Sequence, residues 1–217
     1  MKTRVLLVDD HKMMREGLRA LLAVVDDIEI VGEGASGREA LELVRTTQPH
    51  VVVMDIGMPD LNGVEATRRI RAEYEHVRVI GLSTHSDKRY VHHMLEAGAC
   101  GYVLKIAAHE ELLRAVRAAR LGRSYLSPEI AGHVVSRSTS PNTGADVTAY
   151  STLGGREREV LQLVAEGKTS AETARLMHIS IKTVETHRRN IVQKLGLHGT
   201  AELTKYAIRE GLTSVDQ

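Results

Sequence analysis

Five short apolar stretches, each followed by a helical pattern, most strongly constrain the fold of the first 120 residues. The stretches are continuous in their hydrophobicity, as in 51–54, rather than alternating with polar residues. Strands of this kind are covered on both faces, which a parallel sheet with crossover helices on each side achieves. The sequence therefore predicts an α/β fold with a (βα)5 doubly wound parallel sheet. Its strands are expected at 4–8, 28–31, 51–54, 77–82 and 101–104.

The pattern changes at Gly122, and the rest of the chain divides into a linker and a second domain. The linker contains a polar stretch, 136–150, and a short helix is expected at 128–135 with Ser127 as its N-cap. Beyond it the apolar spacing is helical throughout, which predicts a small all-α domain of four helices at 156–166, 170–177, 181–195 and 201–209. We thus expect a domain at 1–122, a linker at 123–150 and a domain at 151–217.

Composition excludes several classes of function. A single cysteine, Cys100, rules out a disulfide framework and a cysteine-based zinc site. Phe and Trp are absent, so recognition cannot rest on a broad aromatic stacking platform. No apolar run approaches the roughly 18 residues of a membrane span. The first residues lack the apolar region of a signal peptide, so the chain is expected in the cytoplasm with no membrane partner.

Polar and charged residues follow the ends of the expected strands. Asp9 and Asp10 follow the first strand, Asp55 the third, Ser83 the fourth and Lys105 the fifth. Because the carboxyl ends of parallel strands meet at one edge of a sheet, we expect these side chains to lie close together. Converging carboxylates repel one another unless a cation joins them, and hard oxygen ligands favour Mg²⁺. Such a carboxylate, beside Mg²⁺ and a lysine, is arranged to attack a phosphoryl group, and a serine there can hydrogen-bond a phosphoryl oxygen.

Each of these residues also has an ordinary structural explanation. An aspartate after a strand commonly caps a helix or lies in a solvated turn, and a lysine there commonly faces solvent. The segment from Gly32 to Gly37 also fits G-x-G-x-x-G, which is typical of a dinucleotide site. That fold needs two mononucleotide halves, and only five strands fit before the linker. We therefore interpret these glycines as turn residues.

The strand-end residues lie in motifs that resemble the receiver domain of bacterial two-component response regulators. The matching motifs are Val8-Asp9-Asp10-His11, Met54-Asp55-Ile56-Gly57-Met58-Pro59, Gly63, Leu82-Ser83 and Gly101-Tyr102-Val103-Leu104-Lys105. The resemblance covers residues 1–122. It implies that Asp55 is the phosphoacceptor and that Lys105 contacts the phosphoryl group. It also implies that Ser83 and Tyr102 form the switch pair.

The same resemblance implies a Mg²⁺ site formed with Asp55. Asp10 is expected to bind the ion directly, Asp9 to help through water, and the Gly57 carbonyl to complete the site. One departure is Ile106, where many receivers carry proline, and we expect the site to be intact despite it. Similar receivers tune the loss of the phosphoryl group near the position of His85, so His85→Ala is expected to alter the phosphoryl lifetime modestly.

Residues 170–195 have the span of a helix-turn-helix. On the second helix, Val184, Ile191 and Leu195 share a face suited to packing, and a different face is suited to a DNA groove. Arginine can read guanine, glutamate can accept from cytosine, and threonine can contact a thymine methyl group. The candidate base contacts are Lys182, Glu185, Thr186 and Arg189, and the candidate phosphate contacts are Lys182, Thr183, Arg188, Asn190 and Lys194. An ordinary amphipathic helix with solvated charges explains the pattern equally well.

The last domain resembles the LuxR-type DNA-binding domain. The motifs that carry this resemblance are Leu153, Arg156-Glu157, Glu159-Val160-Leu161, Ala165, Gly167, Ile181, Thr183-Val184, His187 and Lys194-Leu195-Gly196. One departure is Gly154, where the family often has threonine, and Gly154 is expected to serve as the N-cap. The whole chain is thus similar to the NarL/FixJ class of response regulators.

This similarity implies a transcription factor rather than an enzyme. Its DNA binding would be controlled by Mg²⁺-dependent phosphorylation of Asp55 by a sensor histidine kinase. One copy of so small a reader binds weakly, so we expect a homodimer on activation, bound to paired half-sites in double-stranded DNA. Leu203, Ala207 and Leu212 offer a possible dimer surface, although packing within the domain explains them as well.

Two other functions use the same residues. An aspartate-nucleophile phosphatase would share the Mg²⁺ site, but such enzymes typically need a second carboxylate two residues after the nucleophile, where this chain has Gly57. A binding module that regulates without phosphorylation would have no use for three repelling carboxylates. Turnover of small phosphoesters would distinguish the phosphatase from the regulator.

Overall fold

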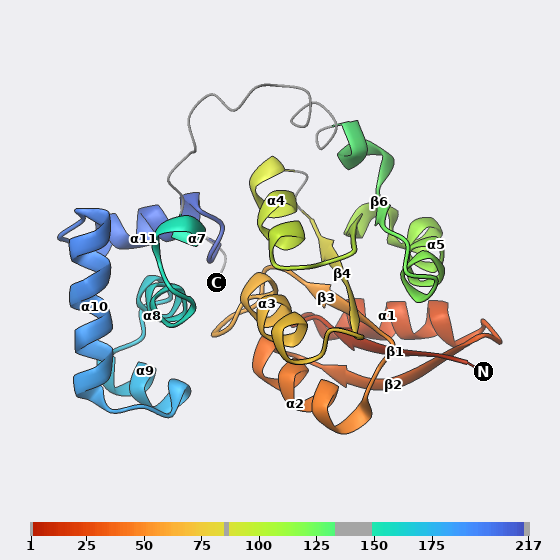
Figure 1. The fold of residues 1–217 in the computed structure, drawn as a ribbon, viewed down its shortest axis with the longest axis horizontal. Coiled ribbons are helices and arrows are strands. Elements are labelled where there is room, and N and C mark those ends of the chain that lie inside the picture. Colours follow the sequence, from red (N-terminus) through yellow and green to blue (C-terminus); the bar gives the residue numbers. More distant parts are fainter. Residues whose placement is uncertain (1, 85–86, 133–148, 215–217) are drawn as a thin grey trace. The chain divides into compact units, whose positions relative to one another are not determined.

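The computed structural model describes residues 2–84, 87–132 and 149–214. The chain folds into two compact units, a sheet unit in the N-terminal part and a helical unit in the C-terminal part (Figure 1). Among the described residues, no helix combines the length and apolar character that a membrane crossing would require.

The sheet unit contains a six-stranded sheet in which every neighbouring pair of strands is parallel. The strands are β1 (Thr3–Val8), β2 (Ile28–Gly34), β3 (Val51–Asp55), β4 (Arg78–Ser83), β5 (Gly101–Leu104) and β6 (Tyr125–Leu126). Their spatial order is β2-β1-β3-β4-β5-β6, so the chain changes direction across the sheet between β2 and β3. This confirms the predicted doubly wound α/β fold. The carboxyl ends of β1 and β3 lie side by side at the change of direction, which is where such folds bind ligands.

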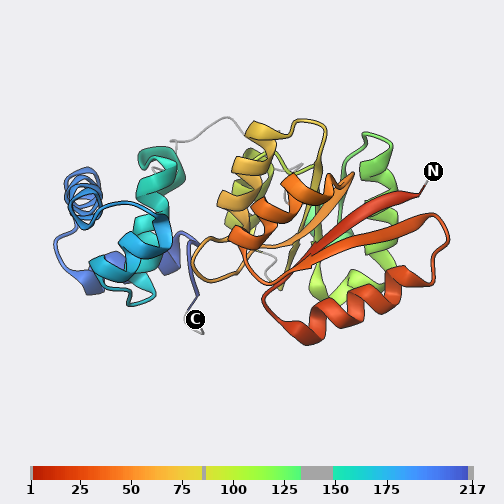
Figure 2. The same cartoon turned by 90° about the horizontal axis from the view of Figure 1, so that it is seen from below.

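Helices cover both faces of this sheet (Figure 2). They are α1 (Lys12–Ala23), α2 (Gly37–Thr47), α3 (Gly63–Glu73), α4 (Lys88–Glu96) and α5 (Ala108–Arg120), with a 3₁₀ turn, η1 (Lys105–Ala107), before α5. On the α1 and α5 side, alternate strand residues such as Val5 and Leu7 pack with Leu22 of α1 and Val116 of α5. The β3 side chains are buried along the whole strand, which explains its unbroken apolar sequence.

The sixth strand was not predicted from the sequence. It pairs with β5 through Gly101 and Tyr125 and through Tyr102 and Leu126. A Cβ atom on Gly101 would lie 2.9 Å from the Tyr125 carbonyl oxygen, so glycine permits this close approach. Two residues are too few to show a strand pattern in the sequence, and the sheet therefore continues into the segment expected to be linker.

The turn interpretation of the glycine motif was wrong. Gly32 and Gly34 lie inside β2, and only Gly37 starts a new element, as the first residue of α2. A Cβ on Gly32 would lie 3.1 Å from a Leu6 methyl group, and one on Gly34 would lie 3.2 Å from a Leu43 methyl group. The missing side chains let these leucines pack closely against the strand.

The segment after β6 agrees only in part with its prediction. Residues 128–132 are helical, and the Ser127 carbonyl accepts hydrogen bonds from Ile130 and Ala131. The Ser127 hydroxyl was expected to cap this helix but instead contacts β5 and α5. Residues 133–135 of the predicted helix, and the polar stretch up to residue 148, lie outside the described residues.

The helical unit consists of a one-turn helix that was not predicted, α7 (Ala149–Thr152), and the four predicted helices. These four are α8 (Gly155–Ala165), α9 (Ser170–Met177), α10 (Ile181–Leu195) and α11 (Thr200–Arg209). Thr169 and Ser180 cap α9 and α10 as expected, and Gly196 ends α10 in the left-handed region at φ 65°. Gly154 occupies the N-cap of α8.

Helix α8 is the centre of this unit, since α9, α10 and α11 all pack against it. The α8 residues Val160 and Leu161 are fully buried. Leu203 and Ala207 of α11 are also buried, which supports packing within the chain rather than the possible dimer surface.

Candidate functional site

Three aspartates converge at the carboxyl end of the sheet. Asp9 and Asp10 follow β1, and Asp55 is the last residue of the neighbouring β3. Together with His11 they offer ligand atoms that all lie within 4.8 Å of one another. Asp9 and Asp55 are almost completely buried, whereas Asp10 is half-buried. The sheet topology thus creates a cluster from residues 46 positions apart in the sequence.

Lys105 joins this cluster from the end of β5. Its Nζ atom lies 2.8 Å from Asp9 Oδ2 and 2.9 Å from Asp55 Oδ2. Burial alone would lower the pKa of Lys105, but its charge interactions and hydrogen bonds with Asp55 and Asp9 outweigh burial and raise that pKa. The ammonium group therefore stays charged and bridges the two aspartates.

One lysine does not neutralise the cluster. Burial, followed by repulsion from Asp9, raises the pKa of Asp55 to about 6, even though Lys105 acts in the opposite direction. Carboxylates that resist ionisation together are the ligands that a hard divalent cation stabilises. The donor set of Asp9, Asp10 and Asp55 fits such a cation, and the backbone N–H of the nearby Gly57 lies 3.4 Å from Asp55 Oδ1.

Ser83 and Tyr102 lie on the two strands that follow this cluster along the sheet. Ser83 is the last residue of β4, and Tyr102 lies on β5 with its ring fully buried. Burial raises the pKa of Tyr102, and a hydrogen bond with Ser83 opposes that shift. The structure thus brings the two expected switch residues into contact.

Gly63 also belongs to the site, although the sequence analysis assigned it no role beyond a motif match. A Cβ atom on Gly63 would lie only 1.9 Å from the backbone carbonyl oxygen of Asp55. The Gly63 N–H donates to the Ile56 carbonyl at 3.0 Å. The start of α3 is therefore pressed against the backbone that carries Asp55, and only glycine fits there. In the sequence, the glycine directly after the N-cap residue Asn62 was the one sign that α3 begins against another backbone segment.

Ile106 and His85 were the two remaining residues expected to bear on the acidic site. Ile106 lies in η1 with 93% of its surface exposed, and it leaves the contacts of the preceding Lys105 intact. His85 lies outside the described residues.

The second candidate site is the outer surface of α10. Val184 and Ile191 are buried against the rest of the helical unit, as the helical spacing predicted. The predicted DNA contacts that are exposed are Lys182, Thr183, Glu185, Thr186, Arg189 and Lys194, and those that are half-buried are Arg188 and Asn190. One helix therefore presents all of the predicted contacts.

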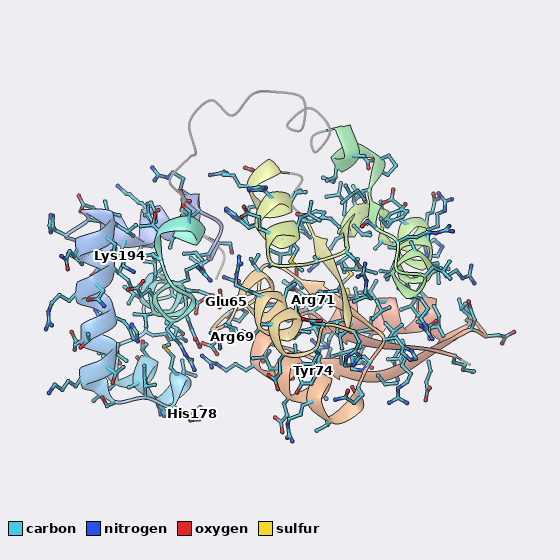
Figure 3. The ribbon with its side chains drawn as sticks, in the orientation of Figure 1. Glu65, Arg69, Arg71, Tyr74, His178 and Lys194 are labelled. Carbon is cyan, nitrogen blue, oxygen red and sulfur yellow. The ribbon has the colours of Figure 1, made fainter. Side chains whose placement is uncertain are left out.

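Several of these side chains already have partners inside the unit. Glu185 accepts a hydrogen bond from the Ser170 hydroxyl at the start of α9. Lys194, near the end of α10 in Figure 3, forms an ion pair with Glu157 of α8 at 2.6 Å. A phosphate contact by Lys194 would have to compete with this ion pair. Among the predicted DNA contacts, Lys194 therefore has the least support.

Two family models match separate parts of the chain. The response regulator receiver domain matches residues 5–117, and the luxR family of bacterial regulatory proteins matches residues 151–207. This chain belongs to the LuxR-family response regulators. The transcriptional regulatory protein LiaR of Bacillus subtilis is 39% identical over 211 residues, which cover 97% of this response regulator and 99% of LiaR.

Solved structures agree with this assignment. Response regulator ChrA of a heme-sensing two-component system is 34% identical, with a TM-score of 0.53. The match covers 97% of this chain and 98% of the ChrA chain. A two-component response regulator of the LuxR family from Aurantimonas is 37% identical and covers 64% of the chain, with a TM-score of 0.61. All of that Aurantimonas chain is matched.

Proposed function

We propose that Asp55 of this response regulator accepts a phosphoryl group from a sensor histidine kinase or a small acyl phosphate. The observation that carries the proposal is that Lys105 Nζ lies 2.9 Å from the Asp55 carboxylate and 2.8 Å from that of Asp9. A carboxylate oxygen of Asp55 forms the new bond to phosphorus. The bond from phosphorus to the donor atom breaks, and the donor leaves with that electron pair.

The surrounding residues supply the charge that this transfer needs. Lys105 is held charged beside the acceptor, where it can stabilise the oxygens of the transferring group. Asp9, Asp10 and Asp55, with the Gly57 carbonyl, would hold Mg²⁺. When bound, this ion neutralises charge on the phosphoryl oxygens.

Ser83 and Tyr102 would report the modification to the surface. The Tyr102 ring is fully buried beside Ser83. The Ser83 hydroxyl would exchange its contact with Tyr102 for a phosphoryl oxygen. That exchange would rearrange the surface at β4 and β5, which favours a homodimer.

The activity that phosphorylation would regulate is the binding of α10 to double-stranded DNA in the cytoplasm. Lys182, Glu185, Thr186 and Arg189 would face the base edges of a major groove, and the remaining predicted contacts would hold phosphates. Two copies on paired half-sites about one helical turn apart would supply the affinity that one copy lacks. Transcription of neighbouring genes would then depend on the state of Asp55.

Intact-mass measurement of the full chain with Mg²⁺ and acetyl phosphate tests the proposal. The wild type and the control variant Asp26→Asn, which changes an exposed aspartate, are expected to gain one phosphoryl group, whereas Asp55→Asn is expected to gain none. DNA retention by each form, measured on the same samples, is expected to rise only where the mass rises. Asp55→Asn with full phosphate-stimulated DNA binding would overturn the proposal, and so would steady turnover of small phosphoesters.

A further inference from the structure

Ser127 is fully buried immediately after β6 and makes three contacts with the elements that flank Lys105. Its backbone N–H donates to the Tyr102 carbonyl at 3.0 Å. Its hydroxyl accepts from the Leu104 N–H at 3.2 Å and donates to the carboxylate of Glu111 on α5. One serine therefore ties the chain leaving the sheet to both β5 and α5.

The hydroxyl completes a hydrogen-bond ladder that the backbone cannot continue. Strand β6 ends at Leu126, and Pro128 two residues later has no N–H and begins a helical segment. The Leu104 N–H would otherwise be a buried donor at the edge of the sheet. The Ser127 hydroxyl provides the acceptor for it.

Glu111 explains why a hydroxyl is needed rather than any acceptor. Its side chain lies in the first turn of α5 and is buried, with 8% of the residue exposed. A buried carboxylate requires a donor, and Ser127 donates to it with the one proton of its hydroxyl. The same oxygen accepts from Leu104, so both partners depend on Ser127.

These contacts bracket the corner from which Lys105 extends. Leu104 is the residue before Lys105, and Glu111 is six residues after it, across the η1 turn. From this corner Lys105 Nζ must stay near 2.8 Å and 2.9 Å from two carboxylates at once. A displacement of the corner by about 1 Å would be enough to impair such a geometry.

We propose that Ser127 and Glu111 form a positioning pair for Lys105. The pair fixes the β5–η1 corner, and through it the lysine that contacts the incoming phosphoryl group. This inference rests on the proposed phosphorylation of Asp55. It also assigns residues up to Ser127 to the working receiver domain, because the corner is incomplete without them.

The test compares full-length variants in their rates of phosphorylation by acetyl phosphate, followed by intact mass at saturating donor. Ser127→Ala removes the hydroxyl, and Ser124→Ala is the matched control at an exposed serine in the same segment. Glu111→Gln keeps an oxygen that can accept from Ser127, and Glu111→Ala removes it. Ser127→Ala and Glu111→Ala are expected to slow phosphorylation at least fivefold, whereas Ser124→Ala and Glu111→Gln are expected to stay within twofold of wild type.

The Mg²⁺ dependence separates positioning from general damage. The half-saturating Mg²⁺ concentration is expected to be unchanged in all four variants, because the pair does not touch Asp9, Asp10 or Asp55. If Ser127→Ala fails to fold, the comparison of Glu111→Gln with Glu111→Ala decides the question.

Three results would have distinct meanings. A folded Ser127→Ala that matches Ser124→Ala in rate would overturn the positioning pair, and so would a loss of Mg²⁺ affinity that accounts for the slower rate. A wild type that gains no mass would instead overturn the proposed function of Asp55 itself.

Discussion

The two candidate sites of this response regulator are built in opposite ways. The acidic cluster collects Asp9, Asp55 and Lys105 from three strands, across almost 100 residues of sequence, and buries them. The surface of α10 takes its residues from one exposed helix of 15 residues. Chemistry on a phosphoryl group needs fixed charges in a shielded place, whereas contact with a DNA groove needs exposed side chains on a rigid rod.

This difference has an energetic consequence. Changes in the acidic cluster alter buried groups, so they should change the stability of the sheet unit together with its chemistry. Changes on the outer surface of α10 should alter DNA binding with little effect on stability.

The largest effect is expected for Gly63→Ala. The new methyl group would lie 1.9 Å from the Asp55 carbonyl oxygen, and because both partners are backbone-fixed, neither can rotate away. We expect the free energy of unfolding of the sheet unit to fall by about 3 kcal/mol or more. Gly57→Ala is the control, since nothing lies within 4 Å of its added Cβ. Urea unfolding measures both, and equal stability of the two variants would contradict the close packing at Asp55.

The next effect is a pH-dependent stabilisation by Asp55→Asn without Mg²⁺. The pKa of Asp55 is about 6 in the folded chain against an ordinary value of 3.8. Between these values the folded state binds more protons than the unfolded state, so the free energy of unfolding falls as pH rises from about 4 to 6. Asp55→Asn should therefore be more stable than wild type by about 2 kcal/mol at pH 7, and by almost nothing near pH 4.

Urea unfolding in EDTA at both pH values checks this result. Asp26→Asn, at an exposed aspartate, should match the wild type throughout. Addition of Mg²⁺ at pH 7 should stabilise the wild type more than Asp55→Asn. A variant less stable than wild type at pH 7 would show that Lys105 outweighs burial at this site.

A smaller effect is expected at the N-terminus of α10. The Ser180 hydroxyl accepts from the Thr183 N–H at 3.1 Å, so Ser180→Ala should lower the stability of the helical unit by about 1 kcal/mol. Ser180→Asp keeps a capping oxygen and should retain wild-type stability. Thermal unfolding followed by circular dichroism measures both. Equal losses in the two variants would mean that the serine acts through packing rather than as a cap.

The parts of the structure that the sequence could predict are those that depend on residues close together in the chain or on the apolar pattern of a strand. The limits of α9 and α10 follow from local signals, namely the caps Thr169 and Ser180 and the stop at Gly196, and the structure confirms them. The parallel sheet, and with it the convergence of the aspartates, follows from unbroken apolar strands.

What the sequence could not predict depends on contacts between distant residues. Strand β6 exists because Gly101 allows it to approach β5. Ser127 precedes the helical segment as predicted, but its hydroxyl contacts Glu111 and Leu104 instead of a backbone N–H of that helix. The ion pair of Lys194 with Glu157 likewise joins residues 37 positions apart. The spacing of apolar and polar residues within one segment does not indicate which distant residue a side chain will contact.

The smallest expected effect separates Lys182 from Lys194 on α10. Lys182 is exposed, whereas the Lys194 ammonium is already paired with Glu157, so of these two lysines Lys182 is expected to release a counterion from DNA. Lys182→Ala should reduce the slope of log affinity against log salt for duplex DNA by about 0.9 and leave stability unchanged. Lys194→Ala should leave that slope unchanged and lower the stability of the helical unit by less than about 1 kcal/mol.

Salt titrations with a non-specific duplex, together with thermal unfolding, measure both quantities. If Lys194→Ala reduced the slope as much as Lys182→Ala, the ion pair would have to open on DNA. Glu157→Gln then distinguishes the two cases. If Lys194 leaves Glu157 for a phosphate, Glu157→Gln should strengthen DNA binding, because the competing carboxylate charge is gone. If Lys194 stays paired with Glu157 on DNA, the substitution should change only stability.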